Sequence, residues 1–348
     1  MSRPKGIGMA PSRTALEMRR SRDEGITFES FGAAEVLVLS KVSSPELRPT
    51  DLLIRNRAAG VNRADLNQRK GAYGRVDFGD STLMGLELAG EVAAMGSEVS
   101  GYEIGDLVMA IVGGGAYAEF ARFAYRMAMR VPAGMDMVLA GAIPEVFVTA
   151  HEALIYLARL QPGEKVLIHA AAGGVGSAAV KLARAIGAQV FATSSATKHR
   201  DVLKLGADVV IDHKTLDFEA VVDSETNQCG VDVIIDFNGA PYLERNVRSL
   251  AVGGRLVQVG LMGGASGGVI PLDRLLFRHL KIIGTVMKSR TAETKQAMTK
   301  RFADSSLEHF ADGRLKPMLD RQCPLAAAAD AHRRMESGES VGKIVLTA

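Results

Sequence analysis

The segment from His169 to Gly176 has the residue types that a diphosphate-binding loop requires. It reads His-Ala-Ala-Ala-Gly-Gly-Val-Gly and follows the apolar run Val166-Leu167-Ile168 directly. Small residues in such a loop permit a tight turn and a close approach of backbone N–H groups, and a helix that starts there adds partial positive charge. The residues that we expect to bind a dinucleotide pyrophosphate are Ala170, Gly173, Gly174, Val175 and Gly176.

The spacing of this loop, A-x-x-G-x-x-G, departs from the commoner G-x-G-x-x-G pattern. A glycine triplet alone is also typical of an ordinary glycine-rich turn. The position of this one, between a buried strand and a helix within a repeated strand and helix pattern, favours a dinucleotide site.

The end of the next apolar run indicates which dinucleotide is bound. Val190-Phe191-Ala192 continues into a stretch of hydroxyls and cations that holds no carboxylate before Asp201. An acidic residue at this place would bind the ribose 2′-hydroxyl of NAD and would repel a 2′-phosphate. We therefore predict NADPH as the cofactor, with Ser194, Ser195 and Lys198 at its site. The alternative is that Lys198 is a solvated charge at the start of the next helix.

The pattern of apolar residues after Pro144 predicts the strands and helices that position these residues. Short apolar runs alternate with helical periodicity, which predicts a parallel sheet buried on both faces by crossover helices. One such helix should start near Val175, since apolar residues follow it at helical offsets, and should end at Gly187. The runs that we expect to be strands are residues 166–168, 190–192, 209–211, 233–235 and 256–259.

The rest of the chain predicts a second, β-rich unit. Between Leu37 and Phe123, short strands alternate with glycine-marked turns, most clearly at residues 52–54, 90–92, 106–109 and 117–120. After residue 284 we expect helices at 291–310 and 325–336 and a last strand at 343–346, which should return to the first unit because they bury too little surface alone. The predicted domains are 1–143 with 284–348, where 1–24 is an extension, and 144–283.

Composition narrows the class of protein. The chain has 348 residues, of which 47% are apolar, enough for two domains with large cores. It lacks an apolar stretch of about 20 residues, so we expect no membrane span. Cys229 and Cys323 form no C-x-x-C pair, which favours a reducing cytoplasm. A formal charge of +3 without basic runs argues against nucleic acid as a principal partner.

Several separated segments resemble the zeta-crystallin-like quinone oxidoreductases, a zinc-independent branch of the medium-chain dehydrogenases/reductases. The resemblance implies an α/β protein in which a GroES-like, β-rich catalytic domain is built from both chain ends and a doubly wound Rossmann domain is inserted between them. The segments that carry it are residues 60–65, 71–73, 85–90, 143–145 with 149–150, 169–176, 259–264 and 342–346.

The resemblance also implies roles for individual residues. Asn62 should lie against the nicotinamide ribose, Tyr73 should line the substrate pocket, and Thr149 and Met262 should approach the nicotinamide, with Tyr73, Asn62 and Thr149 as the catalytic set. Without the resemblance, Asn62 would be a turn residue, Tyr73 a loop aromatic and Met262 a core residue. The further cofactor-binding residues that it implies are Asn238, Gly239, Leu261 and Lys343.

Zinc-dependent relatives carry Gly-His-Glu where this chain has Gly85-Leu86-Glu87, and a Cys-containing loop where it has residues 62–65. The resemblance therefore implies no metal and the NADPH-dependent reduction of quinones or related conjugated carbonyl compounds. An enoyl or alkenal double-bond reductase and a low-turnover NADPH-binding sensor stay open as alternatives. A homodimer formed through an edge of the Rossmann sheet, near residues 255–286, is expected from the family.

Overall fold

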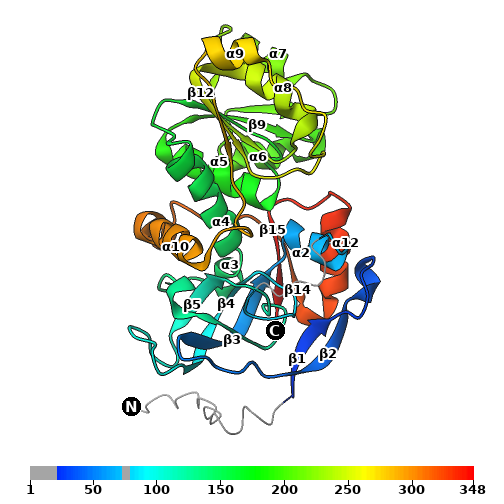
Figure 1. Cartoon of the computed structure of the whole chain (residues 1–348), viewed down its shortest axis with the longest axis vertical. Coiled ribbons are helices and arrows are strands. Elements are labelled where there is room, and N and C mark those ends of the chain that lie inside the picture. Colours follow the sequence, from blue (N-terminus) through cyan, green and yellow to red (C-terminus); the bar gives the residue numbers. More distant parts are fainter. Residues whose placement is uncertain (1–21, 73–78) are drawn as a thin grey trace, which may run out of the picture.

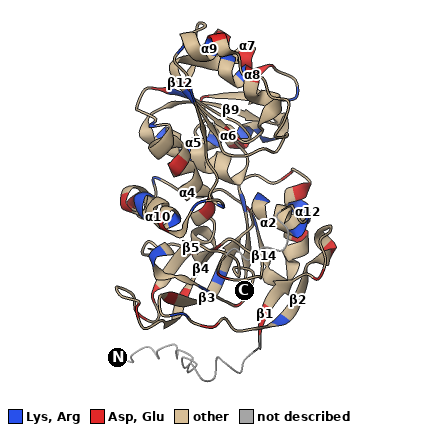
Figure 2. Cartoon of the chain, viewed as in Figure 1, with Lys and Arg blue, Asp and Glu red and all other residues tan. Residues whose placement is uncertain are grey.

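The computed structural model describes residues 22–72 and 79–348 and folds them into two lobes, each built on a sheet of its own (Figure 1). Both ends of the described chain lie in the lower lobe, and the middle of the chain forms the upper lobe. Tyr73 lies outside the described residues. In Figure 2, Lys and Arg are interspersed with Asp and Glu on both lobes.

The upper lobe is a six-stranded parallel sheet of the doubly wound type. Its strands lie in the order β10-β9-β8-β11-β12-β13, so the chain runs outward from the centre in one direction and then in the other. Its strands are β8 (Lys165–Ile168), β9 (Gln189–Ser194), β10 (Val209–Asp212), β11 (Val231–Asp236), β12 (Leu250–Gln258) and β13 (Lys281–Gly284). Its helices are α5 (Gly174–Ile186), α6 (His199–Leu205), α7 (Phe218–Glu225), α8 (Ala240–Ser249) and α9 (Leu272–Phe277).

Alternating side chains of these strands enter two different hydrophobic clusters. In β8, Val166 and Ile168 belong to the cluster that contains residues of α5, whereas Leu167 packs with Phe218 of α7 and Val247 of α8. Burial on both faces explains why the strands read as continuous apolar runs. The predicted helix is confirmed as α5, and Gly187 ends it with a φ of 90°.

The lower lobe is a seven-stranded, mostly antiparallel sheet that joins both halves of the sequence. Strand β15 pairs with β3, with Val345 opposite Gly60, which confirms that the C-terminal tail returns to the first unit. The strands in the order β14-β15-β3-β4-β5-β7 are β14 (Leu319–Pro324), β15 (Lys343–Thr347), β3 (Asp51–Gly60), β4 (Glu87–Met95), β5 (Leu107–Ile111) and β7 (Ala128–Arg130), and β6 (Phe120–Ala124) also pairs with β3.

Helix α4 (Pro144–His151) connects the lobes and continues into a wider, π-helical turn over Glu152–Leu157. It packs on α5 above and on α10 (Ala292–Ser306) beside it. Phe147 of α4 lies with its ring centroid 4.9 Å from that of Phe310. The remaining helices of the lower lobe are α2 (Arg63–Arg69), α3 (Met137–Ala140), α11 (Glu308–Ala311) and α12 (Ala328–Glu336).

Three local expectations were wrong. Residues 22–24 do not belong to an extension, because they start strand β1 (Arg22–Thr27), which pairs with β2 (Val38–Ser43). The run at 117–120 contributes a single bridge from Ala118 to Gly25, and β6 starts only at Phe120. The expected helix at 291–310 is divided into α10 and α11 at Leu307. Within residues 22–72 and 79–348, no helix is long and apolar enough to cross a membrane.

Candidate active site

The glycine loop lies where the strand order of the upper sheet reverses. It connects β8 to α5, and the neighbours of β8 in the sheet are β9 and β11. The helices that follow these two strands, α6 and α8, pack in the two different hydrophobic clusters described above. Loops that diverge at such a point leave a crevice at the carboxyl ends of the strands, where ligands of open α/β sheets bind. The amides of Gly174, Val175 and Gly176 form the first turn of α5 and have no acceptor within the helix. The loop therefore offers bare N–H groups to an anion.

The backbone of this loop is too close-packed for side chains. A Cβ on Gly176 would lie 2.3 Å from the carbonyl oxygen of Ala170 and 2.8 Å from the Cα of Ala171. Ala170 itself has a φ of 47°, a left-handed conformation that costs an L-residue about 1–2 kcal/mol. Thr193 of β9 holds the loop in this shape, because its carbonyl accepts the N–H of Ala171 at 3.0 Å. This geometry fits a diphosphate that approaches the main chain directly.

At the end of β9, Lys198 connects the two lobes. Its ammonium donates to the carbonyl oxygens of Gly338 at 2.6 Å and Ser340 at 2.8 Å, in the loop that leads to β15. Burial lowers the pKa of Lys198, and the nearby cations Arg334 and Arg63 lower it further, although the carboxylates of Asp320 and Glu339 act in the opposite direction. Ser194 is buried and Ser195 precedes Lys198 in the same turn. Contact of Lys198 with a 2′-phosphate stays a prediction.

The loops after β11 and β12 lie at the same carboxyl edge of the parallel sheet as the glycine loop. Asp236 is buried and its carboxylate accepts the N–H groups of Asn238 at 2.8 Å and Gly239 at 2.9 Å, which fixes the turn between β11 and α8. Leu261 and Met262 follow β12 and are 55% and 51% exposed. Met262 is therefore not a core residue of this chain, and the two side chains are available to cover a bound ring.

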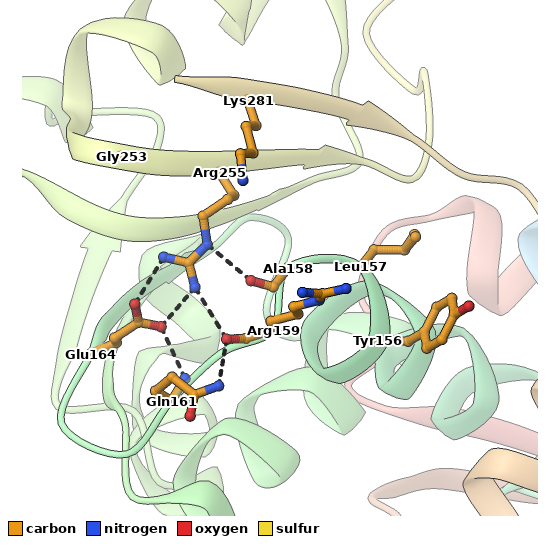
Figure 3. Close-up of a pocket in the computed structure, with 9 residues that line it drawn as sticks. All are labelled: Tyr156, Leu157, Ala158, Arg159, Gln161, Glu164, Gly253, Arg255 and Lys281. Carbon is orange, nitrogen blue, oxygen red and sulfur yellow. Dashed lines mark hydrogen bonds and ion pairs between the residues drawn. The ribbon is translucent and has the colours of Figure 1, made fainter. Parts of the chain in front are cut away.

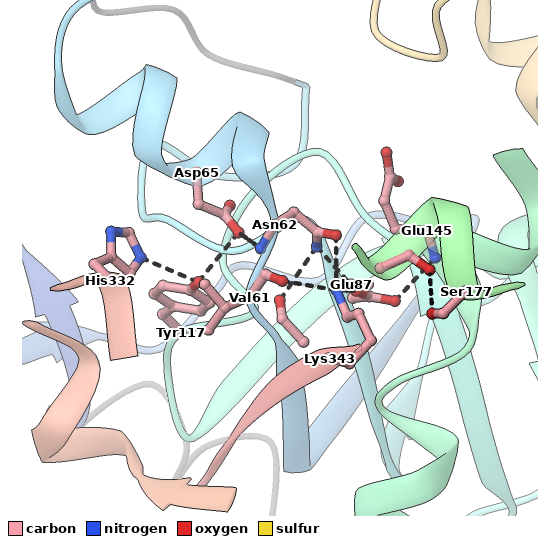
Figure 4. A network of polar contacts seen from close by, with 11 residues as sticks. Val61, Asn62, Asp65, Glu87, Tyr117, Glu145, Ser177, His332 and Lys343 are labelled. Carbon is pink, nitrogen blue, oxygen red and sulfur yellow. Dashed lines mark hydrogen bonds and ion pairs between the residues drawn. The ribbon is translucent and has the colours of Figure 1, made fainter. Parts of the chain in front are cut away.

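From the lower lobe, Asn62 is held in a buried polar network (Figure 4). Its side-chain oxygen accepts from the ammonium of Lys343 at 2.7 Å, and its side-chain nitrogen donates to Glu87 at 2.9 Å. Lys343 also donates to Glu87 at 2.6 Å and to the carbonyl oxygen of Val61 at 2.7 Å. Asn62 is a turn residue as well, because its own N–H donates to the carboxylate of Asp65 just inside α2. Its amide is thus fixed from both sides.

The ammonium of Lys343, a predicted cofactor-binding residue, is bound by protein groups. A lysine ammonium has three donors, and here Asn62, Glu87 and Val61 accept all of them. The alkyl chain of Lys343 packs against the glycine loop, because its Cδ lies 3.1 Å from the position that a Cβ on Gly174 would occupy. Lys343 therefore positions Asn62 and supports the loop, and its contact with a cofactor stays a prediction.

Helix α4 contributes a face that includes the predicted residue Thr149. Thr149 and Glu145 are one turn apart and both are partly exposed, whereas the residues between them are buried. The N–H of Glu145 donates to Glu87 at 2.9 Å, which ties the start of α4 to the Asn62 network. Burial, followed by the nearby charge of Glu87, raises the pKa of Glu145 to about 8. No motif of the sequence indicated a role for Glu145.

A second buried network lies behind α2. The hydroxyl of Tyr117 donates to Asp65 at 3.1 Å and lies 3.3 Å from Nε2 of His332. Burial raises the pKa of Asp65 to about 7 and lowers that of His332 to about 3. These residues are enclosed in the lower lobe and secure the helix that carries Asn62.

The residues around Glu87 do not fit a zinc ion. Zinc is bound by thiolate, imidazole and carboxylate groups. Here the carboxylate of Glu87 is paired with a buried ammonium and an amide, so a dication would be repelled by Lys343. In the described part of the chain, no group of three or more His, Cys, Asp or Glu residues is arranged to hold a metal.

A hollow of about 610 Å³ lies away from this site, near the amino ends of β8 and β13 (Figure 3). Arg255 crosses it and donates to both carboxylate oxygens of Glu164, at 2.7 and 2.8 Å, and to the carbonyl oxygen of Ala158 at 2.9 Å. Its charge is already neutralised there, and ligands of parallel sheets bind at the opposite, carboxyl ends of the strands. We therefore regard the glycine loop, and not this hollow, as the candidate active site.

Comparisons with known proteins agree with this architecture. Residues 48–159 match the alcohol dehydrogenase GroES-like domain, and residues 174–304 match the zinc-binding dehydrogenase family. Quinone oxidoreductase of Homo sapiens is 32% identical over 321 residues, which cover 91% of this chain and 95% of that protein. A phenolphthiocerol/phthiocerol polyketide synthase of Mycobacterium tuberculosis is 31% identical over 97% of this chain, but the chain spans only 16% of that protein.

Solved structures of quinone and enoyl reductases have a similar fold. Escherichia coli quinone oxidoreductase complexed with NADPH has a TM-score of 0.83 and 28% identity, over 94% of this chain and 99% of that one. The CurK enoyl reductase has a TM-score of 0.82 and 26% identity, also over 94% and 99%.

Proposed function

We propose that this chain, which belongs to the zeta-crystallin-like branch of the medium-chain dehydrogenase/reductase family, is an NADPH-dependent reductase of quinones. The observation that carries the proposal is the position of the bare amides of Gly174 to Gly176 at the strand switch point, with Asn62 held beside them by Glu87 and Lys343. The family resemblance of the sequence to quinone oxidoreductases supports the substrate class.

Selection of NADPH over NADH is proposed from the end of β9. Ser194, Ser195 and Lys198 follow this strand, and no carboxylate of the same segment stands where it would bind a ribose 2′-hydroxyl. Arg63 also lies near Lys198 and adds positive charge, whereas the charge of Arg334 is paired with Asp320 and Glu339. The ammonium of Lys198 donates two of its three N–H groups to carbonyl oxygens, so the third is available to a phosphate oxygen.

The chain's own residues then bind and orient. The first amides of α5 bind the diphosphate, the fixed amide of Asn62 sets the position of the nicotinamide ribose, and Thr149, Leu261 and Met262 enclose the ring and exclude water. The bound cofactor supplies a hydride. Positioning of the two reactants can lower a barrier by about 7–11 kcal/mol. A quinone is a good hydride acceptor, so we propose that the reaction proceeds without metal, consistent with the ammonium of Lys343 beside Glu87.

An enoyl reductase is the second candidate, and its support is the similarity to the CurK enoyl reductase. The same cofactor geometry would deliver hydride to an activated carbon–carbon double bond. Oxidation of NADPH by the purified chain, followed at saturating ortho-quinone and at saturating short enone, separates the two. Faster turnover of the quinone supports our proposal, faster turnover of the enone selects the second candidate, and NADPH binding without turnover of either selects a sensor.

We also propose a homodimer and a cytoplasmic location. Strand β13 is an edge strand, and the adjoining helix α9 exposes Leu272, Leu276 and Phe277 by 70%, 67% and 75%. An open strand edge beside exposed apolar side chains is suited to a two-fold contact with a second copy.

A further inference from the structure

The carboxyl group of Glu145 is placed differently from the other acidic groups near Asn62. Its backbone N–H is held by Glu87 at 2.9 Å, but its side chain projects away from the Glu87 and Lys343 pair (Figure 4). Among residues 22–72 and 79–348, no group donates a hydrogen bond to this carboxyl. A partly buried carboxyl without a protein donor is available to a ligand, since carboxyls in structural roles are hydrogen-bonded.

Glu145 is also adjacent to the diphosphate loop. The next residue, Val146, has its Cγ1 only 3.0 Å from the position of a Cβ on Gly174, in the first turn of α5. Thr149 follows one helical turn later on the same face of α4. Glu145 therefore lies between the loop that binds the diphosphate and the amide of Asn62, on the exposed face of the connecting helix.

The groups that face Glu145 favour its protonated form at neutral pH. Burial has the largest effect, and the negative charges of Glu87 on β4 and Asp65 on α2 add to it. Lys343 on β15 and Lys295 on α10 oppose these effects. Together they raise the pKa of Glu145 to about 8. Because the group is an acid, it holds its proton below this pH and loses it above.

We propose that Glu145 is the proton donor of the reduction, which rests on the proposed function. The acceptor gains a hydride, with its electron pair, from the C4–H bond of the reduced nicotinamide. The oxygen of the acceptor becomes an anion and takes the proton from the Glu145 carboxyl. NADP⁺ and the reduced acceptor leave, and the carboxylate regains a proton from water. A general acid in this position is worth roughly 10²- to 10⁴-fold in rate.

The test compares the wild type with Glu145→Gln and with Glu308→Gln, a control at a 74% exposed carboxyl on α11. NADPH affinity is measured by fluorescence, and kcat/KM for an ortho-quinone and an enone is measured from pH 6 to 10. We expect wild-type kcat/KM to fall as the pH rises through about 8. Glu145→Gln should bind NADPH within about threefold of the wild type, lose roughly 10²-fold in kcat/KM at pH 7 and show no such fall. Glu308→Gln should behave as the wild type.

A second measurement does not depend on turnover. Calorimetry of NADPH binding at pH 8, in two buffers with different ionisation enthalpies, counts the protons taken up. An anionic cofactor beside Glu145 should raise its pKa further, so the wild type should take up a fraction of a proton and Glu145→Gln should take up less. Equal uptake by both proteins, or a Glu145→Gln variant with the wild-type pH profile, would overturn the inference. A wild type that binds NADPH but reduces neither acceptor would instead overturn the proposed function, and with it the role of Glu145 as proton donor.

Discussion

Replacement of Gly176 by Ala should distort the cofactor loop more than any other single methyl group added there. The new Cβ would lie 2.3 Å from the carbonyl oxygen of Ala170, about 1 Å inside an ordinary carbon–oxygen contact of ~3.3 Å. The neighbouring atoms are backbone atoms of Ala170 and Ala171, and Thr193 holds them to β9. They cannot rotate away as a flexible side chain would, so α5 or the loop must shift.

Overpacking of this kind costs about 1–3 kcal/mol, and 1 kcal/mol lowers the Tm of a domain of this size by about 2–4 °C. The amides of the first turn of α5 move with the loop, so we expect NADPH affinity to fall at least about tenfold, or ~1.4 kcal/mol. Differential scanning calorimetry and fluorescence titration with NADPH measure the two effects. Gly284→Ala is the matched control, because a Cβ there has no heavy atom within 4 Å.

Wild-type affinity in a folded Gly176→Ala variant would refute the assignment of this loop to the diphosphate. A lower Tm with unchanged NADPH affinity would have the same meaning, since the helix terminus would then be distorted without effect on the ligand.

Four further predictions concern other parts of the molecule. Lys198→Ala should reduce the preference for NADPH over NADH by about tenfold in Kd, the effect of one charge-assisted hydrogen bond, and an unchanged ratio would remove Lys198 from the site. Lys343→Met should lower the free energy of unfolding in urea by about 3–5 kcal/mol, because the carboxylate of Glu87 stays buried without its cation. The double variant with Glu87→Gln should regain most of this loss, and a double variant as unstable as the single one would contradict the pairing. Burial lowers the pKa of His332 to about 3, so the contribution of the neutral imidazole to stability is complete above pH 6.5 and is lost as the pH falls toward 3. The Tm of the wild type should therefore fall more steeply between pH 6.5 and 4 than the Tm of His332→Gln. Phe277→Glu should convert a dimer into a monomer in sedimentation velocity, whereas a wild type that sediments as a monomer would refute the proposed contact.

The cofactor loop could be predicted from the sequence because everything that defines it is local. The strand β8, the small residues 170–176 and the helix α5 are consecutive, and their periodicities differ clearly. The parallel sheet followed from the repeated alternation of short apolar runs with helical segments. Ala118 and the start of β6 were misplaced because a short run beside glycines has no period long enough to fix its limits.

The support of Asn62 could not be predicted in the same way. Its partners are 25 and 281 residues away in the sequence, at Glu87 and Lys343, and only the pairing of β15 with β3 brings them together. A lysine near the C-terminus therefore resembled a cofactor ligand, although its charge is used inside the protein. Glu145 was missed for a related reason, because its unusual pKa depends on burial and on charges from four other elements.

Calorimetric titration of the purified chain with NADPH and with NADH tests most directly whether the glycine loop and Lys198 bind the cofactor. We predict one site per chain and tighter binding of NADPH by about tenfold or more, ~1.4 kcal/mol. Absence of binding by either nucleotide, or tighter binding of NADH, would contradict it.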